Sequence, residues 1–168
     1  MLYYELVIKP DWDKRNKIVV RVQNTITFDD LVDIIVNNIG LDSGHLYEFT
    51  IVKYGTTRKQ QLERGSKIIP EGSEMPYPKL FNNYDLPESE RLAIRAREEK
   101  RIKKETHFTF EPLNSIKCNS GTKMWLLYDF GDMNYFSITC NHIVEGEYAD
   151  EVSVQKHFIK YSDHEGPE

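Results

Sequence analysis

Residues 27–41 contain a complete set of helix signals, and this segment constrains the fold more than any other. Thr27 is a good N-cap residue, and Asp30 stands three positions later, much as in a capping box. Apolar residues then recur on one helical face as far as Ile39. Gly40 stands where a left-handed C-terminal cap is needed. The sequence therefore predicts a helix over residues 28–39 that packs one face onto a core.

Segments typical of β-strands surround this helix. Two strands joined by a loop are expected before it, at residues 2–9 and 18–22, and another follows it at 45–52. A last strand is expected at 152–161. The order strand, strand, helix, strand is the opening of a β-grasp-like α+β domain. We therefore expect a single domain over residues 1–168, with a mixed or antiparallel sheet packed on one main helix.

Residues 124–130 and 134–143 flank Gly131-Asp132 and predict a β-hairpin. A glycine in the first position suits a two-residue type II′ turn, which would pair positions whose numbers sum to 263. In that register one face of the hairpin belongs to the core, namely Trp125, Leu127, Phe136 and Ile138.

The chain has two cysteines, Cys118 and Cys140, too few for a disulfide scaffold or a four-cysteine zinc site. In the hairpin register given above, Cys118 would lie opposite Glu145, far from Cys140. We therefore expect no disulfide and two reduced thiols. Cys118 stands in a slightly basic setting beside Lys117, which is compatible with a reactive thiol.

Residues 53–109 differ in composition from the rest, and we expect them to form a polar, partly helical insertion. Glycine, proline and charged residues dominate 53–87, where no regular period persists. Residues 87–105 hold seven lysines and arginines, five glutamates and few apolar residues, which predicts a mostly solvated helix. This helix carries +2 (7 − 5), so the rest of a chain of net charge −5 carries −7.

A basic helix in an acidic protein is one candidate contact surface for nucleic acid. The residues that would make the contact are Arg91, Arg95, Arg97, Lys100, Arg101, Lys103 and Lys104. Two observations favour a solvated surface helix instead. Glutamates are interleaved with the cations, and the segment has no aromatic residue to stack on bases.

No catalytic motif is complete. Asp129-Phe130-Gly131 matches the magnesium-binding tripeptide of protein kinases, but the other kinase motifs are missing in the required order, so we interpret it as a turn. His45 and Glu48 would point to opposite faces of a strand, and the remaining histidines show no zinc-site spacing. Catalytic residues stay unassigned, and we expect no metal and no cofactor.

Two stretches resemble the plasmid open-reading-frame-three-like family, some members of which are labelled insertion-element passenger proteins. They are Gly44-His45-Leu46-Tyr47-Glu48-Phe49, after the helix that Thr27 caps, and Tyr128-Asp129-Phe130-Gly131-Asp132. The resemblance covers roughly residues 1–52 and 110–160 and leaves the middle unmatched. It implies a compact α+β domain with no established activity and a link to mobile genetic elements.

The chain departs from the family pattern at three positions. Leu41 stands where tryptophan is common, and Asn134 and Phe136 stand where the hairpin usually has tryptophan and histidine. A family site built from His45 and the hairpin histidine would lose half of its residues here. A recombinase activity would need a serine nucleophile supported by arginines, which we do not find.

The function that we expect is a non-enzymatic binding or accessory module. Its candidate binding residues are His45, Tyr47, Asp129 and Asp132, and its partner is expected to be a protein. One alternative is a nucleic-acid accessory protein that uses the basic helix 87–105; another is an enzyme with a site near His45 and Asp129. No apolar run approaches the roughly 18 residues that span a bilayer, so we expect no membrane partner and a cytoplasmic location.

Overall fold

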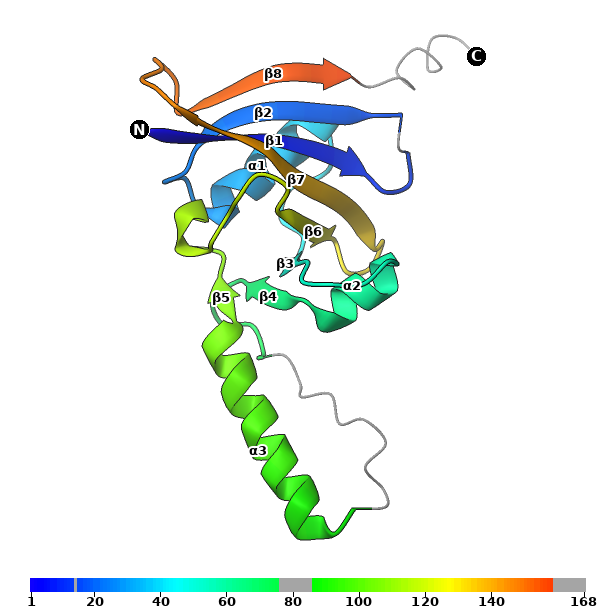
Figure 1. The fold of residues 1–168 in the computed structure, drawn as a ribbon. Coiled ribbons are helices and arrows are strands. Elements are labelled where there is room, and N and C mark those ends of the chain that lie inside the picture. Colours follow the sequence, from blue (N-terminus) through cyan, green and yellow to red (C-terminus); the bar gives the residue numbers. More distant parts are fainter. Residues whose placement is uncertain (14, 76–85, 159–168) are drawn as a thin grey trace.

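A computed structural model describes residues 1–13, 15–75 and 86–158, and the side chains of these residues as far as Gln155. In this part of the chain the fold is α+β, as predicted, with a mixed eight-stranded sheet (Figure 1). The elements in chain order are β1 (Leu2–Pro10), β2 (Lys17–Gln23), α1 (Phe28–Ile39), β3 (Tyr47–Ile51), α2 (Arg58–Arg64), β4 (Ser66–Ile69), α3 (Glu88–Glu105), β5 (His107–Phe108), a 3-10 turn (Leu113–Ser115), β6 (Lys123–Tyr128), β7 (Asn134–Glu145) and β8 (Val152–Phe158).

The strands of the sheet do not follow the order of the chain. Their order across the sheet is β5-β4-β3-β6-β7-β1-β2-β8. All neighbouring strands pair antiparallel except β4 and β5, which are parallel. The predicted last strand begins at Val152, as expected, and residues 159–161 of that prediction lie outside the described residues. The long β7 therefore joins the β1–β2–β8 half of the sheet to the β6–β3–β4–β5 half.

The helix α1 has the predicted boundaries and both predicted caps. The Thr27 side chain accepts a hydrogen bond from the Asp30 amide, and the Asp30 carboxylate accepts one from the Thr27 amide. Gly40 ends the helix with a φ of 85°, a left-handed conformation that glycine adopts without strain. These caps satisfy amide and carbonyl groups that a helix end would otherwise leave unpaired.

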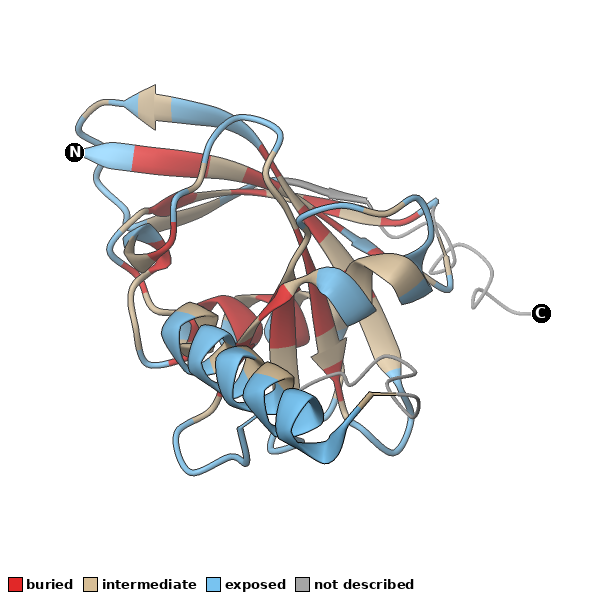
Figure 2. Ribbon diagram, turned by 60° about the horizontal axis from the view of Figure 1, so that its bottom comes forward, coloured by how far each residue is buried: buried red, intermediate tan, exposed pale blue. Residues whose placement is uncertain are grey.

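The hydrophobic core lies between α1 and the sheet. Phe28 of α1 packs edge to face on Phe49 of β3, with ring centroids 5.3 Å apart. Leu31 and Ile35 of the same helix are fully buried in the cluster that contains Leu126 of β6. Figure 2 shows buried residues on α1 and the central strands, whereas α3 is mostly exposed along its length. Burial of one α1 face thus stabilises the fold.

The register of the β6–β7 hairpin is shifted by one residue from our prediction. Met124 pairs with Ile138 and Tyr128 with Asn134, so paired numbers sum to 262 and not 263. The connection has five residues, and both its ends, Asp129 and Met133, have positive φ angles, of 66° and 57°. This longer turn replaces the expected two-residue turn.

Because side chains alternate along a strand, a one-residue shift moves a strand's core set to the opposite face. Phe136 and Ile138 face the core as predicted, but their β6 partners there are Leu126 and Met124. Trp125 and Leu127 instead face the other side of the sheet, so their assignment to this core was wrong.

Part of the other face of the sheet, at β3 and β6, is covered by α2, which the sequence did not predict. Trp125 is buried under this helix, and its indole Nε1 donates to Gln61 Oε1 at 2.8 Å. Gly65, at the C-terminal end of α2, sits so close to β3 that an added Cβ would lie 2.3 Å from the Ile51 carbonyl oxygen. The helix therefore needs glycine at this position for a close approach.

The segment expected as an insertion, 53–109, contributes in part to the sheet itself. Besides the predicted helix α3 it contains α2 and the short strands β4 and β5, which extend the sheet from β3. The signal for α2 was a capping box, in which Thr57 and Gln60 exchange hydrogen bonds. The strands have four and two residues, too few to show a period of two.

The predicted separation of the two cysteines was also wrong. The segment before β6 folds beside β7 through backbone hydrogen bonds between Gly121, Thr122 and Cys140, and this brings the Cys118 and Cys140 thiols close enough to shift each other's pKa. The prediction failed because it extended the hairpin ladder back to Cys118, although β6 begins only at Lys123. Both cysteines are free thiols, as expected.

Candidate functional site

The start of β3 and the turn of the β6–β7 hairpin meet at one end of the sheet. Tyr47, the first residue of β3, pairs with Tyr128, the last residue of β6. The Asp129 amide donates to the Leu46 carbonyl oxygen at 2.7 Å. This pairing brings the His45 Nδ1 atom to 3.4 Å from Asp129 Oδ2. Sequence segments some 80 residues apart therefore form one surface.

Asp129 holds this surface in place with both of its carboxylate oxygens. Its Oδ1 accepts from the Gly131 amide at 3.1 Å and lies 3.4 Å from the Asp132 amide, whereas Oδ2 faces His45. Its carbonyl oxygen accepts from the Met133 amide at 2.7 Å and closes the turn. Asp129 adopts a left-handed backbone, which aspartate tolerates better than most residues. The turn is thus fixed by one side chain.

Two tyrosines support the surface from the α1 side of the sheet. Tyr128 donates its hydroxyl to the Asp42 carbonyl oxygen at 2.5 Å, and the His45 ring packs edge to face on the Tyr128 ring at 5.8 Å. Tyr47 stacks on Tyr128 at 6.3 Å and donates its hydroxyl to Asp29, in the first turn of α1. Burial, followed by the Asp29 carboxylate, raises the pKa of Tyr47 well above its ordinary value.

Of the four predicted binding residues, the structure brings His45, Tyr47 and Asp129 together around Tyr128. Asp132 joins them through its backbone amide, while the residue itself is exposed at the tip of the turn. Tyr47 is half-buried and its hydroxyl is directed at α1, so its role in this geometry is support. The neighbouring Asp42, Asp129 and Asp132 make this end of the sheet acidic.

Sequence reasoning missed three large apolar residues on the same surface. Leu46 is 64% exposed, Phe130 41% and Met133 51%. Leu46 and Met133 are both held by backbone hydrogen bonds to Asp129, and Phe130 follows Asp129 directly. For Phe130 and Met133 the signal was a large apolar residue in or beside the predicted hairpin turn, where polar residues are usual. Leu46 was predicted in the strand 45–52 and gave no such signal. We name His45, Leu46, Asp129, Phe130, Asp132 and Met133 the hairpin end.

The basic helix α3 extends away from the sheet, and no residue in it is buried (Figure 1). Arg95 pairs with Glu99 at 3.1 Å, and Arg101 pairs with Glu98 at 2.7 Å and Glu105 at 2.9 Å. Successive residues are rotated by about 100° around the helix axis, so charges that are neighbours in the sequence lie on different sides of the helix. Four cations share a sector of about 120° that contains none of the helix's glutamates. They are Arg97, Lys100, Lys103 and Lys104, all exposed, and we name them the basic sector.

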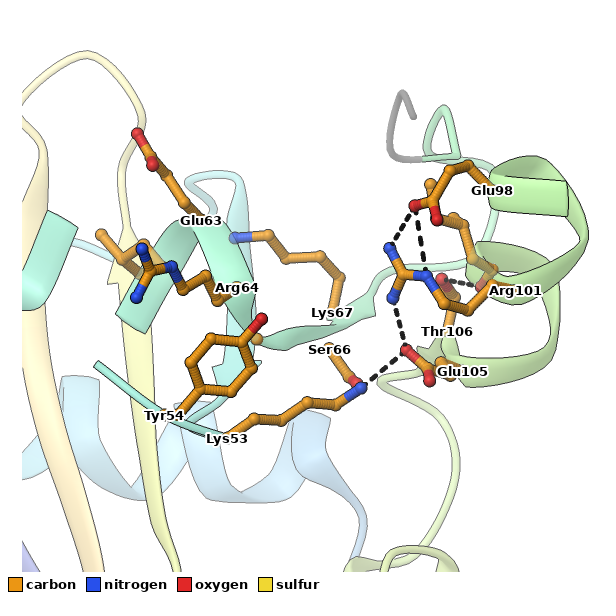
Figure 3. A pocket seen from close by; sticks show the side chains of 13 residues that line it. Lys53, Tyr54, Glu63, Arg64, Ser66, Lys67, Glu98, Arg101, Glu105 and Thr106 are labelled. Atoms are coloured by element: carbon orange, nitrogen blue, oxygen red, sulfur yellow. Dashed lines mark hydrogen bonds and ion pairs between the residues drawn. The ribbon is translucent and has the colours of Figure 1, made fainter. Parts of the chain in front are cut away.

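A cavity of about 670 Å³ lies where α3 meets α2 and β4 (Figure 3). Lys53 donates to Glu105 at 2.7 Å across this cavity, and Glu105 also accepts from Arg101. Lys67, on β4, pairs with Glu48 at 3.1 Å, and the Arg64 guanidinium lies over the Tyr54 ring at 5.3 Å. Of these contacts, the one between Lys53 and Glu105 attaches the base of α3 to the segment after β3.

The predicted sites are therefore at separate places. The cavity at the base of α3 includes no hairpin-end residue, and neither does the shallower one beside Arg58. Among the described residues no three His, Cys, Asp or Glu side chains are grouped so that they could hold a metal ion. In the same part of the chain no helix has the length and apolarity needed to cross a membrane.

Comparison with known proteins identifies a family but no activity. The family described as "Plasmid pRiA4b ORF-3-like protein" matches residues 13–160 and includes the middle segment that our sequence resemblance left unmatched. A crystal structure of a protein of unknown function from Methanosarcina mazei Go1 has the same fold, with a TM-score of 0.61 and 17% sequence identity over 93% of this chain and 69% of that one. No curated protein matches. The chain belongs to the plasmid pRiA4b ORF-3-like family.

Proposed function

We propose that this protein is a binding module that captures a protein partner at the hairpin end. The observation that supports this function is the exposure of Leu46, Phe130 and Met133 beside the His45–Asp129 contact. Exposed apolar residues that are grouped and rimmed by polar groups are typical of protein-binding surfaces. The backbone hydrogen bonds of Asp129 hold the group in place before binding, which lowers the entropic cost of association.

The charges around this surface define the partner's chemistry. Asp42, Asp129 and Asp132 belong to the two segments that carry the apolar residues, and residues 41–47 and 128–134 contain no lysine or arginine. A partner that presents apolar side chains flanked by lysine or arginine would complement both features. We expect charge on the rim to affect the association rate more than the final affinity.

The test compares two variants that each remove one exposed apolar side chain. Phe130→Ser lies in the hairpin end, whereas Leu92→Ser lies on α3 and removes a residue of 59% exposure. Proteins are first captured from cell extract with the wild type and with each variant. A protein that binds the wild type and Leu92→Ser but not Phe130→Ser is then purified and titrated by calorimetry. We expect Phe130→Ser to weaken binding about 30-fold, as for a hot-spot residue. Equal binding by both variants would exclude the hairpin end.

Nucleic-acid binding is the second candidate function, and the basic sector of α3 favours it. The glutamates alternate with cations in the sequence but lie outside the sector that Arg97, Lys100, Lys103 and Lys104 occupy. Four phosphate contacts predict a slope of about −3.6 for the logarithm of the affinity for duplex DNA against the logarithm of salt concentration. Lys100→Ala with Lys104→Ala should reduce this slope by about half.

The chain offers a matched control for that experiment. Arg91→Ala with Arg95→Ala removes the same two charges at the same spacing, but from the opposite side of the helix. We expect this control to leave the salt slope unchanged. Loss of binding in both double variants would mean that net charge, and not the basic sector, determines the interaction.

The remaining parts of the functional prediction have no such support. An enzyme centred on His45, Asp129 and Asp132 stays an alternative, although the cavities described above do not include these residues. A cytoplasmic location and an association with mobile elements also stay predictions. The binding function is proposed from the surface alone and needs neither.

A further inference from the structure

Two cysteine side chains meet where the segment before β6 folds onto β7. The Gly121 amide donates to the Cys140 carbonyl oxygen at 2.6 Å, and the Cys140 amide donates to the Thr122 carbonyl oxygen at 2.9 Å. These bonds hold the turn of residues 118–122 beside the middle of β7. Cys118 packs against the core cluster to which Cys140 belongs, and the two thiols lie close enough to shift each other's pKa. The Cys140 thiol donates to the His142 carbonyl oxygen at 3.7 Å.

The two thiols have different surroundings and so different reactivity. Cys118 is half-buried, whereas Cys140 is only 2% exposed. The neighbouring Cys140 thiol, helped by Thr122, lowers the pKa of the Cys118 thiol. The Cys118 thiol and burial raise the pKa of Cys140. Cys118 is therefore the nucleophile that a small oxidant reaches first, and Cys140 is the thiol that stands next to it.

We propose that Cys118 and Cys140 are a peroxide-sensitive pair that closes into an intrachain disulfide. The Cys118 thiolate attacks hydrogen peroxide, so that an S–O bond forms, the O–O bond breaks and hydroxide leaves. The Cys140 sulfur then attacks the sulfenic acid on Cys118, the S–S bond forms, and the leaving hydroxide takes up the Cys140 proton as water. Two thiols and one peroxide give one disulfide and two waters, and peroxide accepts both electrons.

The location of the bridge gives it a structural consequence. The loop that it closes runs from Cys118 to Cys140 and contains β6 and the first part of β7. The turn of this hairpin carries Asp129, Phe130 and Met133 of the hairpin end. Oxidation would thus tie the base of the hairpin whose turn forms the proposed binding surface. The reaction itself does not depend on that proposed function.

The test is native treatment of the full chain with hydrogen peroxide, followed by denaturation and intact mass spectrometry. We expect the monomer to lose about 2 Da, the mass of two hydrogens, and to lose both titratable thiols. Peptide mapping without reductant should then show the Cys118 and Cys140 peptides joined. A disulfide-linked dimer would overturn the proposal, and so would sulfinic acid on Cys118 beside a free Cys140, or no reaction at all.

Two single variants test the assigned roles. In Cys140→Ser the reaction should stop at a sulfenic acid on Cys118, with a gain of about 16 Da that dimedone traps. In Cys118→Ser the buried Cys140 should stay a free thiol under the same treatment. Faster oxidation of Cys140 than of Cys118 would contradict this order of reaction. The experiment on the wild type decides the proposal even where a variant does not fold.

Discussion

At the scale of single residues, Asp129 does more for the hairpin end than any other side chain. One of its carboxylate oxygens accepts a hydrogen bond within the turn and the other contacts His45. Its backbone is left-handed. We predict that Asp129→Ala destabilises the protein by about 2 kcal/mol, through lost hydrogen bonds and backbone strain. Asp129→Asn keeps an acceptor oxygen and tolerates the left-handed conformation, so it should cost clearly less. Urea unfolding of both variants measures the difference, and equal losses would contradict the assigned role of Asp129.

Tyr47 provides a second prediction at this scale. Tyr47→Phe removes the hydrogen bond to Asp29 and should destabilise the fold by about 1–2 kcal/mol. The raised pKa of Tyr47 means that the folded state holds its hydroxyl proton more firmly than the unfolded state does. The free energy of unfolding should therefore fall as pH rises above the ordinary value of 10.0, and Tyr47→Phe should lack this part of the fall.

Tyr54→Phe is the matched control for that pH series. Tyr54 is 61% exposed, and its ring contact with Arg64 does not need the hydroxyl. We expect this variant to keep the wild-type stability and the wild-type pH dependence. If Tyr47→Phe kept them too, the Tyr47–Asp29 bond would contribute nothing to the fold.

At the scale of elements, local signals predicted α1 well and failed for the hairpin. The caps and apolar face of α1 lie within 15 consecutive residues, so the sequence alone defines its ends. The hairpin register depends on the left-handed conformations of Asp129 and Met133, which neither residue type requires. The resulting one-residue shift in register places Trp125 on the opposite face of the sheet.

The candidate site was predictable only in part for a similar reason. The sequence made His45 and Asp129 candidate binding residues separately, and their contact depends on the long-range pairing of β3 with β6. The exposure of Leu46, Phe130 and Met133 depends on what the rest of the chain leaves uncovered. A large apolar residue in a turn does not reveal from sequence whether another segment covers it.

The attachment of α3 is the third prediction, and it belongs to this scale. The hydrogen bond from Lys53, together with Arg101, lowers the pKa of Glu105. A carboxylate whose folded-state pKa is lowered stabilises the fold above its ordinary value of 4.5, and this contribution is lost as pH falls through the folded-state pKa. At pH values below that folded-state pKa, we expect the hydrogen-exchange protection of residues 101–105 to decrease. Glu105→Gln should show the same decrease already at neutral pH.

This effect should be local and small, because pairs near the surface contribute less than about 1 kcal/mol. Glu99→Gln is the control, since Glu99 pairs with Arg95 inside the same helix. It should leave protection at residues 101–105 unchanged. A similar loss in both variants would mean that the helix frays by itself and that Lys53 does not hold it.

At the scale of the whole molecule, the protein divides into an acidic sheet domain and a basic helix. The main core contains residues of α1 and the sheet and none of α3, which is the largest helix among the described residues. The two candidate contact surfaces lie on different sides of this division. The hairpin end belongs to the sheet domain and the basic sector to α3, so the two functions can be separated by removing one part.

The fourth prediction is that residues 74–105 can be replaced by a flexible linker without unfolding the sheet domain. The strands that they connect, β4 and β5, lie side by side and parallel. A linker of about eight glycine and serine residues is therefore long enough to lead from the end of β4 back to the start of β5. The loss of Lys53–Glu105 should lower the thermal midpoint by only a few degrees. Capture of a partner at the hairpin end and peroxide closure of Cys118 with Cys140 should persist, whereas salt-dependent binding to DNA should disappear. If calorimetry showed no cooperative transition, the sheet domain would need residues 74–105 to fold. If DNA binding persisted, the binding site would lie on the acidic sheet domain and not on α3.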